Sequence, residues 1–312
     1  MIVSASRRTD IPAFYGEWLL HRLQEGYVLV RNPFNSRQVA RVSLDPQVVD
    51  CLVFWTKNPA PLLPLLDAID RLGHRYYFHY TVTGYDRSLE RSLPAKSERL
   101  AVFRRLADRI GPERVLWRFD PILFTREQGP AAVLREYAKL ARALHPYTRQ
   151  CTISFLSLYR KCSRNLQGVD LLSLDDSEKI AFVDQLAALA GQNNISLKSC
   201  CDTFLHERCG IETAQCIDGR LVAELLGQPV RIAKDKGQRP GCGCVSSVDI
   251  GAYDTCAHGC RYCYAISSDR AVTANLRGHD TRSPLLTGVL TDRDVVTEKT
   301  IVSFRSQQAL LF

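Results

Sequence analysis

Strand-like and helix-like segments alternate through the first two thirds of the chain, and this alternation restricts the fold most strongly. The expected strands are short apolar, β-branched or aromatic runs at residues 1–6, 51–56, 76–83, 114–119, 151–158 and 195–200. The expected helices carry apolar residues three and four positions apart, at residues 64–72, 96–110, 131–144 and 177–190. Strands joined through helices pair in parallel, with right-handed crossovers. The pattern therefore predicts an α/β fold.

The number of strand–helix units narrows this prediction. About six units can be counted, fewer than the eight of a closed barrel. We therefore expect a partial (β/α)6 barrel of the TIM type, with an open α/β sheet as the alternative. One departure is a hairpin pattern over residues 27–44. We expect three parts: a partial barrel over residues 1–200, a cysteine-rich cluster-binding segment over residues 201–265, and a C-terminal extension over residues 266–312.

The cysteines are numerous and unevenly placed. Twelve occur in 312 residues, and nine of these lie between Cys200 and Cys263. No segment has the roughly 20 apolar residues of a membrane helix, and charged residues interrupt the N-terminus too early for a signal peptide. We therefore expect a cytoplasmic protein without a membrane-bound part, in which thiols stay reduced. A dense group of reduced cysteines indicates a metal or iron–sulfur site.

The last three cysteines, Cys256, Cys260 and Cys263, are spaced C-x3-C-x2-C, and Tyr262 stands directly before the last one. Three thiolates this close can converge on one inorganic centre if the loop curls around it. Gly259 permits the positive φ that such a turn needs. Iron–sulfur cubanes usually take four thiolates. Three local cysteines therefore indicate a cluster with one iron left open for a substrate or a cofactor.

This motif resembles the signature of the radical S-adenosylmethionine (SAM) enzymes. The resemblance implies that the three cysteines bind a [4Fe-4S] cluster and that Tyr262 occupies the aromatic, cofactor-binding position. It implies that SAM chelates the open iron and that its reductive cleavage yields a 5′-deoxyadenosyl radical. The electron would come from a donor such as flavodoxin or ferredoxin. The superfamily fold is a partial barrel of six units, in agreement with the strand count.

The chain also resembles, over nearly its whole length, an uncharacterised bacterial domain-of-unknown-function family. The similarity rests on the segments SASRRTDIPAF, FWTKNP, RFDPI and CGCVSSVDIGAYDTC. The C-terminal cysteines of that family resemble the radical SAM motif. A more distant similarity links them to the DNA-repair lyases that reverse pyrimidine photoproducts. In most radical SAM enzymes the motif follows the first strand, whereas here it follows the last expected strand. The sequence has no clear glycine-rich SAM-binding motif, and Gly84 is a weak candidate.

Two other interpretations of the motif stay open. The loop could hold an iron–sulfur cluster that does not bind SAM. Zinc favours paired cysteines or mixed Cys/His ligands. A zinc site could therefore form from Cys242, Cys244, Cys256 and Cys263, with help from His258.

A second group of cysteines precedes the motif, so the protein would hold one cluster or two. Our choice of ligands for an auxiliary iron–sulfur cluster is Cys201, Cys216, Cys242 and Cys244. Cys200 is assigned to the end of a strand, and Cys209 is the expected spare. The alternative is that some of these are buried thiols with a packing role only.

The expected strands end in charged or hydroxyl residues, which is where α/β barrels place their chemistry. Six such ends beside a cysteine group predict a polar cavity. We expect Lys57, Arg118 and Asp120 to act in catalysis. Arg7 and Arg8 are expected to bind the cofactor, because arginine holds carboxylates and phosphates. The alternative for Arg118 and Asp120 is a structural ion pair.

Charge and the C-terminus bear on partners. A formal net charge of +8 suits a phosphate-bearing partner such as DNA. The final residues, from Gln308 to Phe312, resemble peptides that bind the bacterial replication sliding clamp; alternatively, this tail docks on the barrel.

We therefore expect a radical SAM-like enzyme of unknown substrate, in DNA repair or nucleic-acid modification. The alternative is a non-catalytic iron–sulfur or zinc module that binds nucleic acid.

Overall fold

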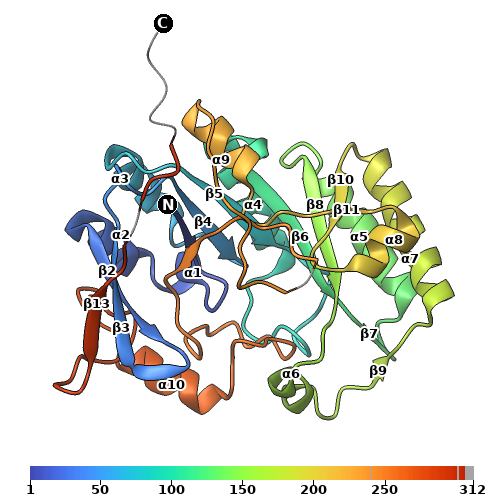
Figure 1. Cartoon of the computed structure of the whole chain (residues 1–312). Coiled ribbons are helices and arrows are strands. Elements are labelled where there is room, and N and C mark those ends of the chain that lie inside the picture. The colour runs from blue at the N-terminus through green and yellow to red at the C-terminus, as the bar shows by residue number, and fades with distance from the viewer. Residues whose placement is uncertain (240, 301, 306–312) are drawn as a thin grey trace, which may run out of the picture.

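The fold is built around one sheet of eight parallel strands (Figure 1). The structure is a computed structural model, and it describes residues 1–239, 241–300 and 302–305. The strands of the sheet are β1 (Ile2–Ala5), β4 (Cys51–Thr56), β5 (Tyr76–Thr81), β6 (Val115–Ile122), β8 (Gln150–Phe155), β10 (Ser196–Ser199), β11 (Glu212–Thr213) and β12 (Val248–Asp249). Their order is β11-β10-β8-β6-β5-β4-β1-β12, and every neighbouring pair is parallel.

The six strands expected from the sequence are present as β1, β4, β5, β6, β8 and β10. Two further strands, β11 and β12, come from the cysteine-rich segment and have two residues each. They lie at opposite edges of the sheet and do not pair with each other in the described part of the chain. The predicted α/β fold is therefore confirmed. Closure into a TIM-type barrel and the domain boundaries at residues 200 and 265 stay predictions.

Helices connect the strands and pack their apolar faces inward. They are α1 (Ile11–Phe14), α2 (Gly16–Glu25), η1 (Leu63–Leu65), α3 (Leu66–Arg71), α4 (Lys96–Ile110), η2 (Pro112–Arg114), α5 (Pro130–Leu144), α6 (Arg160–Asn165), α7 (Asp176–Gln192), α8 (Thr203–Cys209), α9 (Gly219–Leu226) and α10 (Asp269–Arg277). In α4, Phe103, Leu106 and Ile110 recur at helical spacing, and all three are buried. Among the described residues, no helix is both long enough and apolar enough to cross a membrane.

The hairpin expected over residues 27–44 is also present. β2 (Tyr27–Asn32) and β3 (Asn35–Ser43) pair antiparallel, and β13 (Val295–Glu298) pairs with β3 in parallel. Figure 1 shows this three-stranded sheet at one end of the molecule, with α7 and α8 at the other. The short strands β7 (Phe124–Thr125) and β9 (Leu171–Leu172) form a separate ladder.

Aromatic packing in the core fixes the strands that carry the site residues. Phe54 of β4 stacks on Phe78 of β5 with 4.7 Å between ring centroids, and Trp117 of β6 stacks on Tyr137 of α5 at 5.0 Å. All four rings are fully buried. Such pairs contribute ~0.5–1.5 kcal/mol beyond the area that they bury. The ends of β4, β5 and β6 are thereby held in place relative to one another.

Candidate functional site

The C-terminal ends of the eight parallel strands meet at one edge of the sheet, where α/β folds place their binding sites. Arg7 and Arg8 follow β1, Lys57 follows β4, and Arg118 and Asp120 lie toward the end of β6. The structure thus brings these predicted site residues to one edge. Both cysteine groups also extend from this edge, but from different strands.

We call residues 254–265 the cysteine loop, which leaves the edge strand β12 and is held against residues 86–92. Cys260 forms an isolated antiparallel bridge with Glu90. Two further backbone hydrogen bonds join the same segments, at 2.9 and 3.0 Å. Gly259 has a φ of +67°, so the loop turns through the left-handed conformation that this glycine permits. The loop is therefore a defined turn fixed to the segment after β5.

The three thiols of the cysteine loop lie close enough to affect one another. Burial raises the pKa of Cys256, and the nearby Asp10 carboxylate and the other two thiols raise it further. Burial also raises the pKa of Cys260 to about 12, although Lys57 opposes this shift. The Ala265 N–H donates a hydrogen bond to Cys263 Sγ at 3.4 Å. These thiols are neutral by themselves and need a positive partner, such as a metal centre, to become thiolates.

Glu90 is a buried carboxylate that joins the cysteine loop to the sheet. Its Oε1 accepts hydrogen bonds from Lys57 Nζ at 2.8 Å and Thr83 Oγ1 at 2.6 Å, and also from the Tyr262 hydroxyl. Arg99 Nη1 lies 3.6 Å from Oε2. Burial alone would raise the pKa of Glu90, but Lys57 and Arg99 outweigh it and lower the pKa. Burial would lower the pKa of Lys57, and the Glu90 charge reverses this. Both groups are therefore ionised.

Asp10 joins the ends of two strands to the same loop. Its side chain caps α1 by accepting a hydrogen bond from the Ala13 N–H at 3.0 Å. It also accepts one from the Lys57 N–H at 2.7 Å, and its Oδ2 lies 2.7 Å from His258 Nε2. The His258 ring packs against Phe14, with 4.7 Å between centroids. One ring nitrogen of His258 is therefore occupied by Asp10.

Arg8 lines a hollow of about 240 Å³ between the β2–β3 hairpin and residues 250–253, just before the cysteine loop. Its Nε donates to Asp249 at 2.9 Å, and its guanidinium lies 5.6 Å from the Tyr253 ring centroid. Arg7 instead lies over the Trp55 ring, 5.4 Å from the centroid. The side chains of the two arginines that were predicted together thus have different surroundings, although the Arg7 N–H donates to the same Asp249 carboxylate at 2.8 Å. Of the two, only Arg8 lines this hollow.

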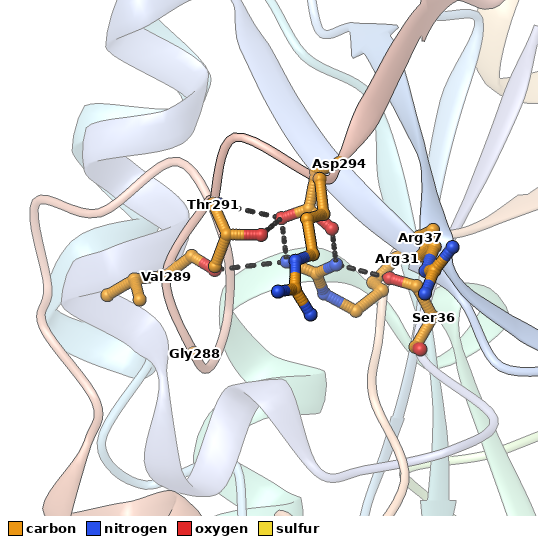
Figure 2. A pocket seen from close by; sticks show the side chains of 8 residues that line it. Arg31, Ser36, Arg37, Gly288, Val289, Thr291 and Asp294 are labelled. Atoms are coloured by element: carbon orange, nitrogen blue, oxygen red, sulfur yellow. Dashed lines mark hydrogen bonds and ion pairs between the residues drawn. The ribbon is translucent and has the colours of Figure 1, made fainter.

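A second hollow, of about 340 Å³, lies at the hairpin and is lined by none of the cysteines. Figure 2 shows Arg31 in its centre, facing Asp294. Arg31 Nη2 donates to Asp294 Oδ2 at 2.9 Å and to the Val289 carbonyl at 3.1 Å, and the Thr291 N–H donates to the same Asp294 oxygen at 2.8 Å. The Arg31 charge is compensated by Asp294. These hydrogen bonds therefore fix the segment before β13 to the hairpin.

Five cysteines form a closed ring of side-chain contacts, which we call the thiol ring. The contacts join Cys200 to Cys201, Cys201 to Cys242, Cys242 to Cys244, Cys244 to Cys216, and Cys216 back to Cys200, the last with 3.6 Å between sulfurs. Cys216, Cys242 and Cys244 are buried, and the other two are half-buried. Four of the five are the set chosen from the sequence. Cys200 was missed because it was assigned to a strand, whereas β10 ends at Ser199.

Arg118 connects the thiol ring to the middle of the sheet edge. Its Nη1 donates to Cys216 Sγ at 2.9 Å. Its Nε and Nη2 donate to the two oxygens of Asp120, at 3.0 and 2.6 Å. Burial alone would lower the pKa of Arg118, but Asp120 and the thiols raise it, so the guanidinium stays charged. Arg118 and Asp120 are thus an ion pair whose arginine also contacts a ring thiol.

The structure separates the predicted ligands into two groups and adds residues that the sequence did not mark. Among the described residues, no three or more Cys, His, Asp or Glu side chains are arranged, as they stand, to hold a single metal ion. Glu90 and Asp249 were not predicted, because their partners lie far away in the sequence: Glu90 meets Cys260, and Asp249 meets Arg8. The predicted clamp-binding residues, 308–312, lie outside the described residues.

Fold and site together define an α/β protein whose parallel sheet carries two groups of cysteines at its C-terminal edge. Residues 2–265 match the model of a family described as a domain of unknown function, DUF1848, and the chain belongs to this family. No curated protein and no solved structure matches the chain significantly. The family match includes the sheet, the thiol ring and the whole cysteine loop.

Proposed function

We propose that the chain is a radical SAM-like iron–sulfur enzyme, with a [4Fe-4S] cluster on Cys256, Cys260 and Cys263 and with SAM at the open iron. The position of the cysteine loop carries this proposal. The loop follows the last strand of the main sheet in the sequence, but that strand, β12, pairs in parallel with β1. Counted across the sheet from β12, the loop therefore leaves the first strand, as the motif does in most radical SAM enzymes.

The strand order also supports a partial barrel. After β12, the sheet continues with β1, β4, β5, β6, β8, β10 and β11, which is the order of these strands in the chain. Consecutive parallel strands with helical crossovers are how (β/α) barrels are built. The proposed fold is therefore a partial barrel in which a strand from the C-terminal part of the chain occupies the first position.

The residues of the cysteine loop fit an iron–sulfur cluster. Three thiols lie on one short turn, and a backbone N–H donates to one of the sulfurs. Hydrogen bonds to sulfur and limited solvent access are the features by which proteins tune such clusters. With three thiolates from the loop, one iron is left for SAM. The cluster, when bound, would supply the electron that cleaves SAM into methionine and a 5′-deoxyadenosyl radical.

The side chains around the loop would bind and orient the small molecules. Lys57 Nζ is fixed between the Glu90 carboxylate and the Tyr262 ring, whose centroid is 5.5 Å away. Its retained charge suits the carboxylate of SAM. The Tyr264 hydroxyl donates to the Arg7 carbonyl at 2.6 Å, which places Arg7 beside the loop. Arg8 lines the adjoining hollow and suits an anionic part of the substrate.

The substrate class proposed is nucleic acid, and the process DNA repair or nucleic-acid modification. The net charge of +8 supports a phosphate-bearing partner. The proposed protein partners are the sliding clamp, through the C-terminal residues, and an electron donor such as flavodoxin or ferredoxin; the proposed location is the cytoplasm. The alternative function is a non-catalytic iron–sulfur or zinc module that binds nucleic acid and has no use for SAM.

The test is anaerobic reconstitution with iron and sulfide, followed by incubation with SAM and a strong reductant. We expect 5′-deoxyadenosine, measured by liquid chromatography and mass spectrometry. The variant Cys256→Ala/Cys260→Ala/Cys263→Ala, which we call the loop variant, should form none. Cys209→Ala is the matched control, because Cys209 is half-buried and belongs to neither group. Wild-type protein with its full iron content but no 5′-deoxyadenosine would contradict the proposal and favour the binding module.

A further inference from the structure

The thiol ring gathers five sulfurs from three separate segments of the chain. Cys200 and Cys201 follow β10, Cys216 comes shortly after β11, and Cys242 and Cys244 lie in the loop before β12. Each sulfur contacts two others. Segments that are far apart in the sequence therefore place their thiols at one point beside the sheet edge.

Two other cysteines of the chain, Cys51 and Cys151, have a packing role and can be compared with the ring thiols. Cys51 and Cys151 are fully buried within β4 and β8, and burial raises the pKa of both thiols. Cys51 Sγ lies 3.5 Å from the Leu52 carbonyl, and Cys151 neighbours the Tyr137 hydroxyl. Such thiols behave as small apolar side chains. The ring thiols differ because each of them contacts two other sulfurs.

The backbone of the ring is held in conformations that simple packing does not require. Cys201 has a φ of +54°, in the left-handed region that residues other than glycine rarely adopt. Gly243 separates Cys242 from Cys244 in a tight space, where an added Cβ would lie 3.0 Å from the Gln215 side chain and would require that side chain to move. Backbone strain of this kind gathers at binding sites.

Positive charge and hydrogen-bond donors face the ring sulfurs. Arg118 Nη1 donates to Cys216 Sγ at 2.9 Å. Arg239 contacts Cys201 and donates to the Tyr159 hydroxyl at 3.2 Å. A backbone N–H donates to a third ring thiol at 3.4 Å. A neutral thiol gains little from an arginine, whereas a thiolate bound to iron is stabilised by it.

We propose that the thiol ring is a second metal centre, separate from the cysteine loop, and that it binds an iron–sulfur cluster. Its ligands are Cys201, Cys216, Cys242 and Cys244. The first has the strained backbone, the second contacts Arg118, and Cys244 accepts the backbone hydrogen bond. Cys242 is buried between Cys201 and Cys244. Cys200 is a fifth thiol, next to two of the ligands.

The ring chemistry favours iron and sulfide over zinc. Four thiolates can hold zinc as well as an iron–sulfur cluster. The hydrogen bonds that Arg118 and a backbone N–H donate to ring sulfurs are a feature by which proteins tune iron–sulfur clusters, and they favour iron and sulfide here. Each cysteine sulfur moves with a single side-chain torsion. The ring sulfurs can therefore change direction without a change of their backbone. The proposal of a cluster in the thiol ring is independent of the proposed function, because such a cluster needs neither SAM nor the cysteine loop.

The first test counts iron and acid-labile sulfide in protein purified without oxygen. The loop variant should keep about half of the wild-type iron and sulfide. Adding Cys242→Ala and Cys244→Ala to it should reduce both to background, whereas adding Cys209→Ala should remove neither. Cys209 is a half-buried thiol in the neighbouring helix α8, close to Asp184 and Asp202. This control separates the loss of ring ligands from the loss of any cysteine.

A second test needs no variant and applies even if the ring variants fail to fold. Iodoacetamide should label Cys209 in the wild-type holoprotein and leave Cys201 unlabelled until a chelator removes the iron. Equal labelling of Cys209 and Cys201 before iron removal would overturn the proposal. So would a folded loop variant without iron, or a ring found by mass spectrometry to hold stoichiometric zinc or a disulfide. Retained ring iron without SAM cleavage would count against the proposed function alone.

Discussion

The cysteine loop and the thiol ring extend from the same edge of the sheet, but different groups surround their sulfurs. The loop takes three thiols from one short turn, and its neighbours are the charged side chains of Asp10, Lys57 and Glu90. The ring takes five thiols from three segments, and each thiol contacts two others. Three thiolates leave a cluster open to a small molecule, whereas the ring has more thiols than a cluster needs. In our proposal, the neighbours of each group, and not the count of cysteines, distinguish the reactive centre from the closed one.

The largest expected effect comes from the carboxylate that fixes the loop. Glu90 is 2% exposed and lies between Lys57 and Arg99, so Glu90→Gln leaves buried cations without a partner. Removing one member of a buried ion pair costs ~3–5 kcal/mol. We expect a loss of that size in the free energy of unfolding, measured by urea denaturation without oxygen.

Glu136→Gln is the control for this change. Glu136 also pairs with two lysines, Lys96 and Lys139, but Lys139 is exposed. Glu136→Gln should lower the free energy of unfolding by about 1 kcal/mol or less, since exposed ion pairs contribute little. Equal losses for the two variants would mean that Glu90 does not hold the loop more firmly than a surface ion pair would.

A second prediction separates the two regions by activity. Lys57→Met should reduce 5′-deoxyadenosine formation per bound iron by about 10- to 100-fold, because a charge-assisted hydrogen bond contributes ~1.5–3 kcal/mol. Lys198→Met is the matched change on the ring side of the sheet, where Lys198 pairs with Glu212 at 3.3 Å. It should leave SAM cleavage unchanged. Similar losses of SAM cleavage in both variants would mean that Lys57, beside the cysteine loop, has no special role in binding SAM.

The third prediction concerns the ring and Arg118. Arg118→Lys keeps the charge but shortens the side chain that donates to Cys216 Sγ. Weaker donation to sulfur should destabilise the reduced cluster and lower its reduction potential. A redox titration followed by electron paramagnetic resonance measures this shift. Arg114→Lys, at the other end of β6, where Arg114 donates to the Tyr76 carbonyl, should cause none. An unchanged reduction potential in the Arg118 variant would mean that Arg118 does not influence a cluster in the thiol ring.

The smallest effect on the folded protein is expected from the C-terminus. Truncation after Ser306 should leave the iron content and the SAM chemistry of both regions unchanged, because it removes no residue of the loop or the ring. It should abolish binding to the purified sliding clamp in a pull-down experiment. Equal binding by the intact and truncated proteins, or binding by neither, would remove the support that the tail gives to a DNA substrate.

Much of the fold could be predicted because strand and helix periodicity is a local signal. The six longer strands and the stripe of α4 follow from it. The two-residue strands β11 and β12 could not be predicted, because so short a run has no periodicity. The spacing of the loop cysteines was also a local signal, and it led to Cys256, Cys260 and Cys263 directly.

The neighbours of the cysteines could not be predicted in the same way. Glu90 stands in a polar stretch without periodicity, and it reaches Cys260 only because two distant segments pair. The position of β12 beside β1 is a tertiary contact of the same kind. Arg118 and Asp120 were recognised as a pair, but the contact of Arg118 with Cys216 depends on how the chain after β11 returns to the sheet edge.

The most direct test of two separate centres, one of them open to SAM, is electron paramagnetic resonance of the reduced wild-type protein while SAM is added. The account predicts signals from two clusters. SAM should change only the signal that is absent from the loop variant, and the signal of the thiol ring should stay as it was. A single cluster signal, or two signals that SAM leaves unchanged, would contradict the account.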